Sequence, residues 1–330
     1  MIKLFKEVDN KLLCIKDKEN IFDSIEKNMW IHVSCPKPSD IEKISRVTNF
    51  DKDLLLTLLD EEESAHLDVD DDYTLIVLDI PVNVNGVYET YPFAIIYNDD
   101  YYLTICKKDT QFLEQMLNKF KRIEPHKHVR LTLQIMYRIA SSYIISLKAL
   151  NSVRKNFENA LHEAMTNKEL IELNRLNKSF VYFSTSLNAN KVVLNKIKRL
   201  PEYKKYEDDF DLMEDVEVEN SQAVEMCQIY RDILTGMMNT SASIISNNLN
   251  IVMKALAIIT LIISIPTLIA SLFGMNVPVP FEDKNNGFYI IIGTSIVLAL
   301  IGGIFVYRLT SKASSVENDK KRNRRRKYRK

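Results

Sequence analysis

The sequence predicts an α+β domain, followed by a long helical stalk and two C-terminal transmembrane helices. Three observations predict this fold class. Residues 1–108 hold β-rich runs around a hairpin turn signal, residues 126–200 hold neither proline nor glycine, and two C-terminal runs hold no charged residue. Only Gly86 of the seven glycines precedes residue 236, which excludes a glycine-rich nucleotide-binding fold.

Residues 1–125 are predicted to form the α/β part. The runs TLIVLDIPVNV and YETYPFAIIY flank Asn85-Gly86, a signal for a two-residue hairpin turn, and DDYYLTIC resembles a further strand. Residues 40–60 instead show helical spacing of apolar side chains, which predicts two short helices there.

Residues 126–250 are predicted to form a helical hairpin and a stalk helix. The polar residues 166–169 are the predicted reversal between two arms of about 30 residues. Beyond Pro201 there is no proline before Pro266, so one helix is expected from about Met213 to Phe273. Because so long a rod is unstable alone, we expect identical stalks to associate in an oligomer.

Two apolar runs predict membrane spans. Residues 255–273 and 288–307 are 19 and 20 residues without a charge, and at ~1.5 Å per residue each reaches the roughly 30 Å of a bilayer core. We therefore expect a first transmembrane helix at 251–273, an outer loop at 274–287 and a second transmembrane helix at 288–307. The alternative is a pair of buried helices in a soluble domain.

The tail at 308–330 carries eleven Lys and Arg against two acids. The excess of positive charge predicts that this tail and the N-terminal part are cytoplasmic in a multi-pass protein of the plasma or inner membrane. The tail is expected to attract anionic lipid headgroups rather than nucleic acid.

One face of the expected long helix is small or polar. Steps of three and four residues back from Gly274 give Ser271, Thr267, Ser264, Thr260, Ala257, Met253, Asn250, Ser246, Ser243 and Asn239. Such a stripe is typical of close helix packing, with hydroxyls bonded to their own helix, and equally of a water-lined passage. Asn250 and Asn239, which extend the stripe below the membrane, favour the passage.

Catalytic spacings are missing from the sequence. The five histidines and four cysteines form no Ser-His-Asp, metal-hydrolase or CxxC pattern, and each histidine is expected to be exposed or structural. We expect neither an enzyme nor an organic cofactor.

Two acidic clusters predict regulation by cations. Residues 60–72 and 207–219 each hold eight acids in thirteen residues. Subunit interfaces bearing them would repel without counter-ions, so Mg²⁺ bridging between subunits is expected to hold a closed state. For most of these acids, a solvated surface is the alternative.

The sequence resembles the CorA-type magnesium channel family over nearly its whole length. The resemblance rests on Gly274-Met275-Asn276 between two terminal spans, preceded by PTLIASLF and followed by a short loop and a basic tail. Further matches are Tyr230-Arg231-Asp232-Ile233-Leu234 in the stalk and, more loosely, WIHV at 30–33, LLTLLDEEE at 55–63 and DDYTLIVLDIP at 71–81.

The resemblance implies a funnel-shaped homopentamer, in which the first span lines a pore and the second faces lipid. Its implied selectivity filter is Gly274, Met275 and Asn276, with an outer ring of Asn276 amides. The pore-lining residues that the resemblance implies are Asn250, Leu256, Ser264 and Thr267, with Leu256 as a hydrophobic gate, and the small or polar stripe adds Thr260 and Ser271. Asn239 replaces a frequently acidic pore position, and VPVPFED, with Glu282 and Asp283, replaces the usual outer-loop run.

The resemblance also implies a regulatory metal site at Asp215, with a partner among Asp60, Glu61, Glu62 and Glu63. The predicted function is thus passive Mg²⁺ conduction, with Mg²⁺ as both transported and regulatory ion. Two alternatives stay open: a transporter of zinc, cobalt or nickel with the same fold, and a non-conducting membrane-anchored structural or sensory protein.

Overall fold

The computed structural model describes residues 1–9, 11–15, 21–108, 117, 122–160, 167–275 and 286–327, without the side chains of 159, 160, 167, 287 and 309–327. The chain divides into two compact units, Met1–Met238 and Asn239–Lys330. One helix, α6 (Glu207–Phe273), begins in the first unit and ends in the second. Each unit is described separately below.

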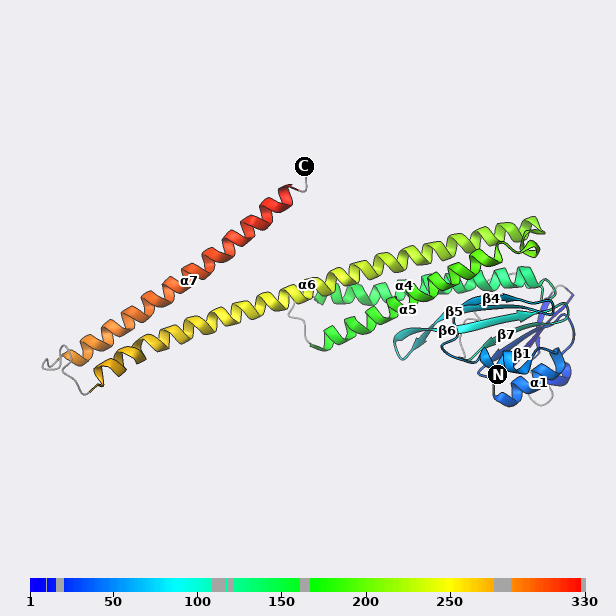
Figure 1. Ribbon diagram of the computed structural model, residues 1–330, viewed down its shortest axis with the longest axis horizontal. Helices are drawn as coiled ribbons and strands as arrows, with labels where there is room; N and C mark the ends of the chain where they lie inside the picture. The colour runs from blue at the N-terminus through cyan, green and yellow to red at the C-terminus, as the bar shows by residue number, and fades with distance from the viewer. Residues whose placement is uncertain are drawn as a thin grey trace. The chain divides into compact units, whose positions relative to one another are not determined.

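The first unit contains a seven-stranded sheet with the order β2-β1-β3-β7-β6-β5-β4 (Figure 1). Only the β3–β7 pair is parallel; the other neighbouring strands are antiparallel. The strands are β1 (Ile2–Val8), β2 (Lys11–Ile15), β3 (Trp30–Ser34), β4 (His66–Val69), β5 (Thr74–Val84), β6 (Val87–Tyr97) and β7 (Tyr102–Cys106).

The predicted hairpin at Asn85-Gly86 is confirmed. It joins β5 to β6, with Val84 paired to Val87. Asn85 and Gly86 have φ values of 52° and 85°, the left-handed conformation that a two-residue turn of this type requires at both positions. The turn therefore fixes which residues of the two longest strands face each side of the sheet.

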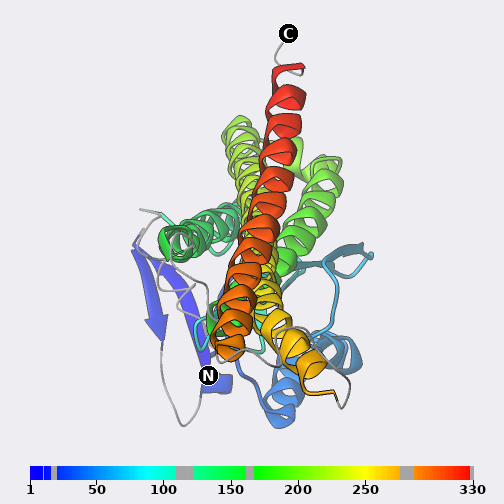
Figure 2. The same cartoon turned by 90° about the vertical axis from the view of Figure 1, so that its left-hand side faces the viewer.

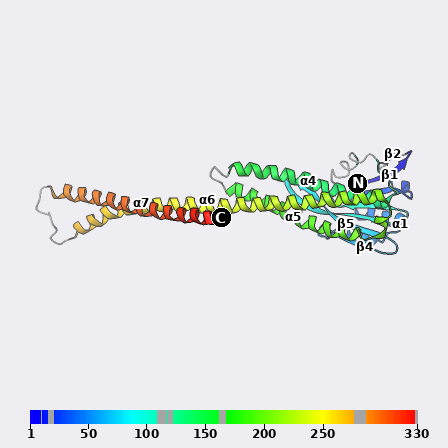
Figure 3. The same ribbon diagram turned by 90° about the horizontal axis from the view of Figure 1, so that it is seen from above.

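The sheet separates two hydrophobic layers, so this unit has helices on both faces (Figures 1 and 3). One face packs against two short helices, α1 (Pro38–Thr48) and α2 (Lys52–Thr57), as the spacing in residues 40–60 predicted. The other face packs against α4 (His128–Ala160), α5 (Asn167–Ile197) and the start of α6. Two short 3₁₀ helices, Ile21–Ser24 and Pro201–Lys204, complete the described connections.

The predicted reversal of the helical hairpin at 166–169 is wrong for residues 167–169, and Thr166 lies outside the described residues. Helix α4 ends at Ala160 and α5 begins at Asn167, so residues 167–169 form the first turn of α5. Asn167 and Glu169 suit a helix start, where short polar and acidic side chains are favoured. Figure 2 looks along these helices.

The continuous helix predicted from Met213 to Phe273 is confirmed, and it begins earlier, at Glu207. Its first turn holds Glu207, Asp208 and Asp209, which favours a helix N-terminus through the helix dipole. Helix α7 (Gly287–Lys327) follows. Within α6 and α7, two segments are long and apolar enough to cross a membrane, the second being Phe288–Arg308.

His32 in β3 is buried, and burial together with nearby positive charge lowers its pKa to about 3. Its Nδ1 atom lies 2.9 Å from the Thr104 hydroxyl, which also accepts a hydrogen bond from the Trp30 indole. Since the unfolded chain protonates this histidine near pH 6.5 and the folded chain does not, acid favours unfolding.

We expect His32 to remove about 2 kcal/mol from the free energy of unfolding between pH 7 and pH 5, at about 1.36 kcal/mol per pH unit below 6.5. Denaturant titrations at several pH values measure this slope. His32→Gln, which keeps a polar group facing Thr104, should flatten the slope, and an unchanged slope would assign the acid sensitivity to other groups.

Candidate pore and regulatory residues

The predicted pore-lining hydroxyls form an exposed row on α6. Thr260, Ser264 and Thr267 donate hydrogen bonds to the carbonyl oxygens of Leu256, Thr260 and Ile263, at 2.8, 2.7 and 2.8 Å. This is the bonding that the packing interpretation expected. A hydroxyl that donates its hydrogen still offers two lone pairs, however, so the row can accept hydrogen bonds from water molecules.

The opposite side of α6 contacts α7. Ile258, Leu261, Ile265 and Ile269 are partly covered, whereas Asn250, Leu256 and Ser271 are exposed in the chain. At about 100° per residue, the hydroxyl row points roughly 140° away from these covered positions. The hydroxyl row is therefore left for water or for other copies of α6.

Small residues in α7 form this contact. A Cβ atom at Gly302 would lie 2.9 Å from Cδ1 of Ile265, and one at Gly303 would lie 3.3 Å from Ile262. Ser295 and Ala299, buried on the same face, continue the spacing of four residues. Such small-xxx-small spacing lets two transmembrane helices approach closely.

The predicted filter begins where α6 ends. The last helical residue is Phe273, and Gly274 still donates its N–H to Ala270 O at 3.0 Å. Met275 is 55% exposed. Asn276, like Glu282 and Asp283, lies outside the described residues, so its role stays a prediction.

The predicted regulatory acids lie on two separate elements of the first unit. Asp60, Glu61 and Glu62 are exposed after α2, and Glu63 is half-buried. Asp60 accepts a hydrogen bond from the Glu62 N–H, and Glu61 pairs with Lys107 at 3.2 Å. Asp215 is exposed on α6. Among the described residues, Asp215 does not contact any of these four acids within the chain. Its partner can therefore lie in another subunit.

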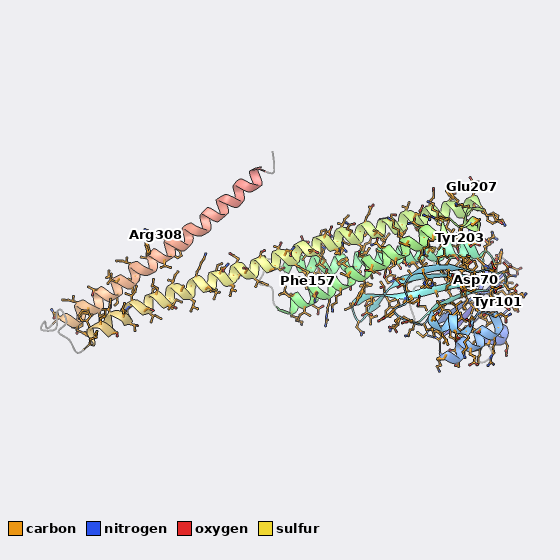
Figure 4. All side chains as sticks on the ribbon, in the orientation of Figure 1. Asp70, Tyr101, Phe157, Tyr203, Glu207 and Arg308 are labelled. Atoms are coloured by element: carbon orange, nitrogen blue, oxygen red, sulfur yellow. The ribbon has the colours of Figure 1, made fainter. Side chains whose placement is uncertain are left out.

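The other ends of the two acidic clusters line a common cleft. Asp70, Asp71 and Asp72 from the first cluster and Asp208 and Asp209 from the second line one open cleft of about 1020 Å³. Figure 4 shows Asp70, Tyr203 and Glu207 at this end of the first unit. Sequence reasoning missed this cleft, because the two clusters are about 140 residues apart.

Arg130 partly compensates the acids of the cleft. Its guanidinium lies 3.3 Å from Asp209 and 3.8 Å from Asp208. At the cleft wall the Tyr97 hydroxyl donates to Glu202 at 3.0 Å and lies 3.2 Å from the Tyr203 hydroxyl. Burial and this carboxylate raise the pKa of Tyr97, so the phenol stays protonated.

The sheet-and-helix unit, the long helix and the two candidate spans are the parts expected of a membrane protein that has a large domain before two spans. Residues 26–309 match the family of CorA-like Mg²⁺ transporter proteins. The chain belongs to this family, and with it to the transporters of the CorA Mg²⁺/Co²⁺ type.

Individual relatives agree with this family. The cobalt/magnesium transport protein CorA of Methanocaldococcus jannaschii is 28% identical over 287 residues, which are 84% of this chain and 89% of that protein. The solved structure of the CorA magnesium transporter from the same organism has a TM-score of 0.77 at 25% identity, over 93% of this chain and 97% of that chain. The full-length CmaX protein shares the fold, with a TM-score of 0.70 at 15% identity over 93% and 97%.

Proposed function

We propose that the chain forms a passive channel for hydrated Mg²⁺, built from five copies whose α6 helices surround the pore. The observation that carries this proposal is the exposed hydroxyl row of α6, which points away from α7. Five such rows facing one axis give a passage lined by acceptor oxygens, and α7 then lies between α6 and the lipid. Leu256, 63% exposed, supplies a hydrophobic constriction on the same helix.

Selection occurs at Gly274, Met275 and Asn276. Mg²⁺ gives up its six waters reluctantly, so a ring of amide oxygens can recognise the hydrated ion by accepting hydrogen bonds from those waters. Neutral amides bind such an ion weakly enough for it to leave, whereas a carboxylate ring would hold it longer. Met275 packs rather than binds, because a thioether is a soft ligand and Mg²⁺ a hard cation.

The termini are cytoplasmic, and the loop between α6 and α7 faces outward. The support is charge: residues 308–330 carry a net charge of +9, from eleven basic and two acidic residues, beside the second span. The negative potential across the membrane then drives cations inward without ATP. Mg²⁺ that accumulates inside binds Asp215 and the acids 60–63 of a neighbouring copy and closes the pore.

Ion uptake into liposomes tests this function. Purified protein should admit Mg²⁺ when a potassium diffusion potential makes the interior negative, with no nucleotide present. Faster uptake of Zn²⁺ or Co²⁺ than of Mg²⁺ would favour the transition-metal transporter. Protein that passes none of the three ions would favour a membrane-anchored structural or sensory protein.

A further inference from the structure

Three potential metal ligands lie together in the first unit, away from both spans. Glu7 of β1, Glu124 and His126 place one ligand atom each within 4.8 Å of one another, and the His126 Nδ1 atom lies 3.2 Å from Oε2 of Glu7. Donors that share a tetrahedral metal at about 2.1 Å are about 3.4 Å apart. Side-chain rotations that move the ligand atoms by up to roughly 1.4 Å would therefore bring all three onto one ion.

A rigid turn orients two of the three ligands. The Lys127 N–H donates to Glu124 O at 3.0 Å, so residues 124–127 form a β-turn with Pro125 at its second position. Proline fixes φ there and suits this position. Glu124 is 6% exposed, whereas the His126 side chain is 48% exposed. Solvent can thus reach the ligands while the backbone holds them.

Two cations compensate the carboxylates without covering every oxygen. Arg122 and Lys127 contact Glu124 through its Oε1 atom, each at 3.0 Å, and Arg122 lies 3.9 Å from Oε1 of Glu7. Both cations contact Oε1 atoms, whereas the His126 nitrogen lies at Oε2 of Glu7, so a metal beside His126 would bind Oε2 of Glu7.

We propose that Glu7, Glu124 and His126 bind one transition-metal dication, of the Zn²⁺ or Co²⁺ kind. An imidazole nitrogen with two carboxylates favours such ions over Mg²⁺, which prefers oxygen ligands alone. The metal would link β1 to the turn that precedes α4. This site is independent of the proposed pore, since neither α6 nor α7 contributes a ligand.

Equilibrium dialysis of the full-length protein against Co²⁺ tests the site, with excess Mg²⁺ present to occupy all-oxygen sites. The wild type should bind one Co²⁺ per chain at this site. His126→Ala should weaken Co²⁺ binding by roughly 100-fold, because removing a ligand should cost at least as much as changing a residue that only supports a ligand. Glu7→Gln should weaken Co²⁺ binding too. Equal Co²⁺ binding by the wild type and both variants would overturn the proposal.

Two further variants separate metal binding from general disturbance. His66→Ala is the matched control, because His66 pairs with the single carboxylate Glu63 at 3.4 Å, and Co²⁺ binding should stay unchanged. Lys127→Met should tighten Co²⁺ binding about 10-fold by removing a positive charge near the ion. The proposed site would be contradicted if His66→Ala weakened Co²⁺ binding as much as His126→Ala does. It would also be contradicted if Lys127→Met weakened Co²⁺ binding.

Discussion

Asn276→Ala is expected to lower Mg²⁺ uptake into liposomes by roughly 70-fold. One hydrogen bond contributes a net free energy of at least about 0.5 kcal/mol. Losing the amide acceptors of five subunits together therefore costs about 2.5 kcal/mol, which corresponds to about 70-fold. The loss falls on ion recognition, since alanine keeps the backbone and removes only the amide. Initial uptake rates at matched protein content measure the effect.

Leu272→Met is the matched control for this substitution. It exchanges an exposed apolar residue of α6, about one turn before the proposed filter, for an apolar side chain of similar volume. Mg²⁺ uptake should stay close to the wild-type rate. If Asn276→Ala and Leu272→Met both conduct like the wild type, recognition of the ion lies elsewhere in the chain.

The parts of the fold that depend on neighbouring residues could be predicted from the sequence. Asn85-Gly86 forms the predicted hairpin because only such residues adopt positive φ readily. Helix α6 could be predicted because the helix contains no proline before Pro266, and only about two turns separate Pro266 from the end of the helix at Phe273. The error at residues 166–169 has the same local origin, since Thr166 to Glu169 suit a helix start as well as a turn.

Contacts between distant residues could not be predicted. The parallel pairing of β3 with β7 joins residues about 70 apart, and it depends on the packing of helices over both faces. Likewise, no local pattern places Glu7 beside His126, or Asp70 in one cleft with Asp208. The hydroxyl row was visible as a period of three and four residues, but its orientation away from α7 requires the contacts of Gly302 and Gly303.

Asp215→Ala is expected to keep the channel conducting at internal Mg²⁺ concentrations that close the wild type. Asp215 is exposed on α6, and under the proposed function it shares a Mg²⁺ ion with acids 60–63 of the next subunit. Without this carboxylate the closed state binds Mg²⁺ less tightly, so Mg²⁺ favours closing less. The half-inhibitory Mg²⁺ concentration should therefore rise about 10-fold, within the usual range of coupling between sites.

Glu214→Ala provides the control, because Glu214 is also exposed and acidic but projects about 100° around α6 from Asp215. Both variants remove one negative charge, so a general electrostatic effect would shift inhibition equally in the two. Patch-clamp currents or liposome uptake at graded internal Mg²⁺ distinguish the cases. A larger shift for Asp215→Ala means that a specific carboxylate holds the ion, whereas unchanged inhibition would remove Asp215 from the regulatory site.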